Sequence, residues 1–68
     1  MSVGELVALA RELNGWSLRQ LEKKTGISNA LLSQIETGRI KNPSWWNVVK
    51  IAGALNLKLE RLAKCDRE

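Results

Sequence analysis

The 68-residue chain contains no histidine and a single cysteine, Cys65, and these two shortages exclude several kinds of functional site. Without histidine or a cluster of cysteines, the sequence offers no common zinc-binding motif. A glycine-rich phosphate loop and a plausible pair of catalytic carboxylates are also absent. One cysteine cannot form an intrachain disulfide, and no signal peptide is present, which indicates an intracellular protein. We therefore expect no enzymatic activity, no small-molecule substrate, no metal and no cofactor.

Long hydrophobic runs and strand-like alternation are missing as well. No apolar stretch approaches the roughly 20 residues that a membrane span requires, so no membrane contact is expected. Neither an internal repeat nor a low-complexity segment is present. Hydrophobic residues make up 44% of the chain and charged residues 26%, a balance typical of a globular domain. We expect a single all-α domain over residues 1–68, a compact bundle of four to five short helices.

Start and stop signals locate these helices. Ser2 with Glu5, and Ser17 with Gln20, have the spacing of a capping box. Apolar residues at helical spacing follow, and predicted helix ends lie at Gly15, Gly26, Gly38 and Asn56. In the first helix the apolar residues are Leu6, Leu9, Ala10 and Leu13. A short last helix over Leu59 to Ala63 precedes a charged tail, residues 64–68.

The net charge of +4 is concentrated in the middle of the chain. Residues 19–50 hold six Lys and Arg against two Glu, six minus two, while the rest of the chain balances at five against five. A basic face of this kind is the expected footprint for a polyanion. The alternative is a solvated face that keeps a small protein in solution.

Four motifs in register resemble the Cro and repressor type of helix-turn-helix domain, often called the XRE-like family. They are LEKKTGIS at 21–28, SQIETG at 33–38, NPS at 42–44 after a basic loop, and KIAGAL at 50–55. The resemblance covers residues 6–62 and places the helix-turn-helix at 17–37. It implies a lambda-repressor-like fold, an ion pair between Arg11 and Glu36, and binding to double-stranded DNA.

The helix after the Gly26 corner has the pattern of a base-reading helix. Leu32 and Ile35 form its buried stripe, and short side chains that can contact bases occupy the opposite side. Asn and Gln can each contact adenine through two hydrogen bonds, Ser can donate or accept, and Ala can contact a thymine methyl. The candidates for base readout are Asn29, Ala30, Ser33 and Gln34. Taken singly, an N-cap role for Asn29 and a solvated position for Gln34 are the alternatives.

Contacts to the DNA backbone are expected on either side of that helix. Ser17 and the free N–H groups that follow it can bind a phosphate at the positive end of a helix. The resemblance adds the loop residues Arg39, Lys41 and Asn42, and Arg19 is a further candidate with a solvated position as its alternative. Four residues depart from the family pattern: Leu18, Glu22, Thr25 and Leu31. Leu18 questions one side-chain contact to DNA, and Glu22 and Thr25 question the tightness of the corner. Leu31 stands where a hydroxyl residue often meets a phosphate, and its role is left open between contact with a thymine methyl and contact with a neighbouring side chain.

The tryptophans are assigned by position. Trp16 and Trp45 match apolar core positions of the family and are expected to be buried, whereas the helical phase of Trp46 places it nearer the surface. An exposed tryptophan can anchor a dimer, stack on a partner or cover the basic loop. The alternative for Trp46 is a ring partly covered by its own helix. We name Trp46, Leu57 and Leu59 as candidate dimer contacts, with a monomer that pairs only on DNA as the alternative.

These observations favour a sequence-specific transcriptional regulator of the bacterial cytoplasm, associated with the nucleoid. The short chain favours a phage Cro-like protein or small repressor that occupies a palindromic operator as a homodimer. An antitoxin or a restriction-modification controller would use the same module. The alternative from another class is a protein-interaction module whose basic face is incidental.

Overall fold

The computed structural model describes residues 2–65, and the side chains of residues 2–62. This part of the chain folds into five helices: α1 (Val3–Leu13), α2 (Leu18–Thr25), α3 (Asn29–Thr37), α4 (Trp45–Leu55) and α5 (Leu59–Cys65). The predicted all-α fold class is therefore confirmed. Residues 64 and 65, which we assigned to a charged tail, belong to α5, and residues 66–68 of that tail lie outside the described residues.

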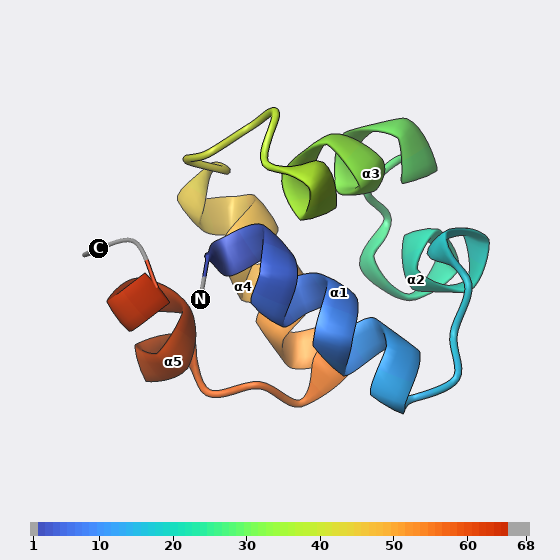
Figure 1. The fold of residues 1–68 in the computed structure, drawn as a ribbon. Coiled ribbons are helices and arrows are strands. Elements are labelled where there is room, and N and C mark those ends of the chain that lie inside the picture. Colours follow the sequence, from blue (N-terminus) through green and yellow to red (C-terminus); the bar gives the residue numbers. More distant parts are fainter. Residues whose placement is uncertain (1, 66–68) are drawn as a thin grey trace.

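The helices surround one apolar core (Figure 1). α1 and α4 lie across the middle of the molecule, with α2 and α3 on one side and α5 on the other. Every helix contributes to the core, which consists of Val3, Leu6, Val7, Ala10, Leu21, Ile27, Leu32, Ile35, Ile51, Ala52, Leu55 and Leu62. α3 packs against both α1 and α2, so two neighbours set the orientation of the predicted base-reading helix.

The predicted capping signals are present. Ser2 and Ser17 each accept a hydrogen bond from the backbone three residues on, and Glu5 and Gln20 accept in return from the backbone N–H of Ser2 and Ser17. The hydrogen bond from the Ser2 backbone lowers the pKa of Glu5 below its ordinary value. α2, α3 and α4 end in left-handed residues, respectively Gly26, Gly38 and Asn56.

The corner between α2 and α3 is closed by a residue that departs from the family pattern. Thr25 is buried, and its hydroxyl donates to the Leu21 carbonyl at 2.8 Å. The same oxygen accepts from the Ile27 backbone N–H at 3.1 Å. Ile27 is itself 4% exposed and fills the corner. Thr25 therefore satisfies its own polar group and fixes the corner, which answers the doubt that the sequence raised about its tightness.

α1 and α3 approach each other closely at Gly4. A Cβ at this position would collide with the backbone carbonyl of Ile35 and lie 2.8 Å from the carbonyl oxygen of Glu36. Gly4 is buried in the first turn of α1. The missing side chain thus lets α1 rest directly on the backbone of α3.

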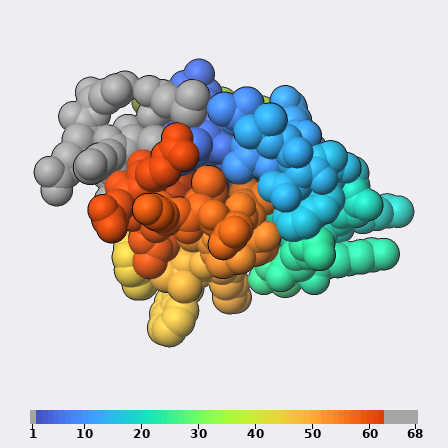
Figure 2. Space-filling model, turned by 90° about the horizontal axis from the view of Figure 1, so that it is seen from below, coloured from blue at the N-terminus to red at the C-terminus, as the bar shows by residue number. Residues whose placement is uncertain are grey.

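Burial was predicted correctly for some side chains and wrongly for others. Trp45 is 63% exposed, contrary to the prediction, because α4 buries its apolar face only further along, at Ile51, Ala52 and Leu55. Trp46 is 72% exposed, as its helical phase predicted, and Figure 2 shows the yellow start of α4 projecting from the body of the molecule. In α1, Leu9 and Leu13 are 43% and 78% exposed, because the buried stripe is formed by Val3, Leu6, Val7 and Ala10. Trp16 is half-buried and packs against the core.

Candidate nucleic-acid interface

α3 carries the four predicted base-reading residues on one side, which we call the readout face: Asn29, Ala30, Ser33 and Gln34. Leu32 and Ile35 lie on the opposite side, at 0% and 1% exposure, and anchor the helix. Asn29 and Ala30 in the first turn are exposed, and Ser33 and Gln34 one turn later are half-buried. Within the described part of the chain, the side chains of Ser33 and Gln34 make no hydrogen bond. Their polar groups are therefore available to an external partner.

Asn29 is the member of the readout face that already has a partner. Its side-chain Nδ2 donates to Glu22 Oε1 at 2.9 Å, which joins α2 to the first residue of α3. Its expected structural alternative was an N-cap role, but Ser28 occupies that position and accepts from the Leu31 backbone N–H at 3.2 Å. The sequence did not predict the pair with Glu22, since seven residues and a turn separate the two side chains.

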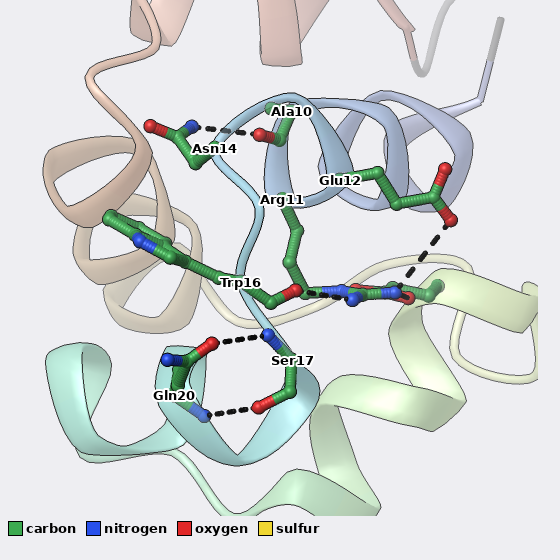
Figure 3. Close-up of polar contacts among 8 residues, drawn as sticks. Ala10, Arg11, Glu12, Asn14, Trp16, Ser17 and Gln20 are labelled. Carbon is green, nitrogen blue, oxygen red and sulfur yellow. Dashed lines mark hydrogen bonds and ion pairs between the residues drawn. The ribbon is translucent and has the colours of Figure 1, made fainter.

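Arg11 ties three segments together behind α3 (Figure 3). Its guanidinium donates twice to the Glu36 carboxylate, from Nε at 2.7 Å and from Nη2 at 3.1 Å. Nη1 donates to the Trp16 carbonyl at 2.7 Å. The two side chains are only 15% and 9% exposed, and the hydrogen bonds to Glu36 raise the pKa of Arg11 further above its ordinary value. This pair fixes α3 to α1 and to the connection before α2.

The start of α2 offers backbone donors to an anion. Ser17 Oγ accepts from the Gln20 backbone N–H at 3.1 Å, and Gln20 Oε1 accepts from the Ser17 N–H at 2.8 Å (Figure 3). Within residues 2–65 the backbone N–H groups of Leu18 and Arg19 have no such partner. The Leu18 side chain, which stands where the family often has Gln or Thr, packs against the core instead. The helix end therefore presents free N–H groups and the Ser17 hydroxyl proton.

The loop after α3 is anchored by Ile40, which stands between the cations Arg39 and Lys41. The Ile40 N–H donates to the Gln34 carbonyl at 3.1 Å, and the Ile40 side chain packs against the core. Arg39, Lys41 and Asn42 on either side of it are exposed. This loop and the start of α2 lie at opposite ends of α3 (Figure 1). Exposed cations therefore lie at one end of α3, and backbone N–H groups without a partner among the described residues lie at the other.

The remaining basic residues have different surroundings. Arg19 and Lys23 are exposed on α2. Lys24 lies over the Trp16 ring, with Nζ 4.7 Å from the ring centroid, a cation–π contact that the sequence did not reveal. Leu31, whose role the sequence left open, packs against the core of its own chain.

The candidate dimer contacts lie away from the readout residues in sequence. Trp46 and Leu59 are 72% and 38% exposed, whereas Leu57 is half-buried and packs against the core. The described residues include no group of His, Cys, Asp or Glu that would hold a metal ion. No helix among them is both long and apolar enough to cross a membrane.

Comparison with known proteins matches residues 7–62 to the family model described as helix-turn-helix. The chain is 35% identical over 60 residues to the HTH-type transcriptional regulator SlrR of Bacillus subtilis (strain 168). That match covers 88% of this chain but only 40% of the length of SlrR. The fold is also similar to the crystal structure of SinR, the master regulator for biofilm formation, in complex with DNA. Here the TM-score is 0.85 at 30% identity, over 90% of this chain and 97% of the SinR chain. Neither protein is described as an enzyme, in agreement with the sequence analysis.

Proposed function

The chain belongs to the XRE-like helix-turn-helix family, and from this premise we propose that it is a sequence-specific transcriptional regulator that binds double-stranded DNA. The readout face of α3 is the observation that carries the proposal, because it combines exposed or half-buried side chains of the kinds that can contact bases with a buried opposite side. The similarity to SinR, whose structure was determined with DNA, supports the same function.

Each part of the interface receives a role in this proposal. α3 enters the major groove, where Asn29 and Gln34 contact adenine, Ser33 contacts either purine or pyrimidine, and Ala30 contacts a thymine methyl. Phosphates flank the helix, bound by Ser17 and Arg19 at one end and by the loop residues Arg39, Lys41 and Asn42 at the other. The free N–H groups at the start of α2 and the exposed cations of the loop support these assignments.

Regulation by occupancy of an operator is the mode that we propose. A phage Cro-like protein remains the more specific prediction from the sequence. The chain spans 40% of the length of SlrR, so the DNA-binding part of a longer regulator is a second form that the similarity supports. In either form the site of action is the bacterial cytoplasm and its nucleoid.

We also propose that two copies bind a palindromic operator. The exposure of Trp46 supports a role in the contact between copies, and Leu59 adds apolar area that is partly open. Sedimentation of the wild type and of Trp46→Ala, each free and with operator DNA, tests this assignment. A dimer in the wild type that dissociates in the variant supports it. A dimer that the variant leaves intact assigns the contact to other residues.

Selection from a randomised pool of duplex DNA at near-physiological salt tests the function itself. We expect enrichment of a palindrome with half-site centres about 10 base pairs apart. In a second round, Gln34→Ala should lose about 1 to 3 kcal/mol of binding free energy on the selected site and relax the preference at one base pair. Thr37→Ala, about one turn beyond Ser33 and not among the four readout residues, is the control. If the wild type enriches no sequence, the protein-interaction alternative is favoured over sequence-specific DNA binding.

A further inference from the structure

Glu22 stands beside the readout face although it belongs to α2. Its carboxylate accepts from Asn29 Nδ2 at 2.9 Å, and this hydrogen bond crosses the corner between the two helices. Glu22 is half-buried, whereas Asn29 is exposed and Glu22 is the hydrogen-bond partner of its side chain. The carboxylate is thus the group that orients the Asn29 amide.

The chemistry of the pair allows only one orientation of that amide. An ionised carboxylate can accept hydrogen bonds but cannot donate them, whereas an asparagine amide has two N–H donors and one acceptor oxygen. Turning the amide over would set Oδ1 against a carboxylate oxygen and lose the hydrogen bond. Glu22 therefore occupies one N–H of Asn29 and leaves one N–H and Oδ1 for another partner.

We propose that Glu22 is a specificity-determining residue, which holds Asn29 in the orientation that selects adenine over guanine; this rests on the DNA-binding function proposed above. In the major groove adenine presents an acceptor, N7, and a donor, N6, which match the one donor and one acceptor that Asn29 has left. Guanine presents two acceptors, N7 and O6, so the fixed Oδ1 would face an acceptor. Glu22 acts by positioning Asn29, and the discrimination is made by the amide.

A simpler role for Glu22 would be electrostatic. A carboxylate near the DNA repels phosphates, and its removal would strengthen binding to every sequence alike. Positioning predicts something different, a change in the ratio of affinities for two duplexes that differ in one base pair. That ratio is unaffected by a general change of charge, so it separates the two roles.

The experiment compares the Kd values of the protein for two duplexes. The first is the selected site. The second is the same site with G·C in place of A·T at one base pair, the one at which Asn29→Ala relaxes the preference. Glu22→Ala should reduce the preference for A·T by about two- to tenfold, the factor that corresponds to the net contribution of one hydrogen bond. Glu22→Gln keeps an acceptor oxygen and should reduce it less. Glu60→Ala, which removes the same charge from an exposed position on α5, should leave the ratio unchanged.

A double-mutant cycle completes the test. In an Asn29→Ala background, Glu22→Ala should have no effect on the ratio, because the amide that it positions is gone. An equal effect in both backgrounds would show that Glu22 acts independently of Asn29 and would overturn the proposal. So would an unchanged ratio in Glu22→Ala, or an Asn29→Ala variant that relaxes no base pair.

Nuclear magnetic resonance of the free protein provides a readout that needs no DNA. The two Nδ2 protons of Asn29 should shift when Glu22 is replaced by Ala and stay in place in Glu60→Ala. Unshifted protons in Glu22→Ala would overturn the proposal even if the regulator binds DNA. If the wild type selects no DNA sequence, the function proposed above falls, and this inference falls with it, whatever the amide protons show.

Discussion

The same substitution, glycine to alanine, should have opposite effects at two helical positions of this protein. Gly4 lies in the first turn of α1, where a Cβ would collide with the backbone carbonyls of Ile35 and Glu36 in α3. Gly53 lies in α4 and is exposed, and apart from its chain neighbours and the backbone of its own helix no atom lies within 4 Å of where its Cβ would be. Alanine is the better helix former at both positions, so the difference between the variants isolates the packing of α1 against α3.

The magnitudes follow from two opposing contributions. Replacing Gly by Ala in a helix gains up to about 1 kcal/mol, and Gly53→Ala should realise most of it. At Gly4 the neighbours are backbone atoms that cannot rotate away, so the cost of overpacking should reach about 3 kcal/mol. Gly4→Ala is therefore expected to be destabilised by roughly 2 kcal/mol, once the gain in helix propensity is subtracted from the cost of overpacking.

Thermal and urea unfolding followed by circular dichroism provide the assay. For a domain of this size, 1 kcal/mol corresponds to a shift in Tm of roughly 4 to 8 °C. We expect Gly53→Ala to raise the Tm by about that amount and Gly4→Ala to lower it by roughly twice as much. Equal stabilisation in both variants would refute the close approach of α1 to α3. A Gly4→Ala variant that keeps its stability but loses DNA binding would show that α3 has shifted without unfolding.

Two further predictions concern charge. Glu36→Gln removes one partner of the ion pair to α1 and should cost about 1 to 3 kcal/mol in urea unfolding, between the values for exposed and buried pairs. The control is Glu12→Gln, because the Glu12 side chain is 68% exposed and its carboxylate lies 4.0 Å from the same arginine. It should change the free energy of unfolding little, and an equal loss of stability in both variants would contradict a stabilising role for the Arg11–Glu36 pair. Arg39→Ala and Lys41→Ala should weaken binding to all DNA sequences alike and each reduce the slope of log K against log salt by about one. A loss confined to one sequence would instead make that residue a base reader.

The fold could be predicted from the sequence largely because its helix ends are marked locally. A capping serine or a left-handed glycine depends on a few neighbouring residues, so Ser17, Gly26 and Gly38 could be assigned without tertiary information. The burial of individual side chains could not be predicted in this way. Trp45 has the helical spacing of a core residue, yet it is 63% exposed, and the fully buried residues of α4 begin only at Ile51. Periodicity defines a face, and only the packing of other helices decides how far along it burial extends.

The candidate site likewise has features that the sequence could predict and others that depend on tertiary packing. The order of residues along α3 is enough to place four side chains on one face, because neighbours on a helix follow from its period. Contacts across the corner are not encoded by any spacing. The pair of Glu22 with Asn29 and the contact of Lys24 with Trp16 depend on how α2 is set against its neighbours. In the sequence, Glu22 was visible only as a departure from the family pattern.

The structure also shows how the nine-residue α3, which we propose reads DNA, is held in place. Near its end, α3 is fixed to α1 by the backbone contact at Gly4 and by the ion pair between Arg11 and Glu36. At its start it is fixed to α2 by the corner that Thr25 closes. Since the two anchors belong to different helices, neither a slide along the helix axis nor a rotation about it is possible without breaking one of them. If α3 binds DNA as proposed, its readout face is already ordered in the free protein, which reduces the conformational entropy lost on binding.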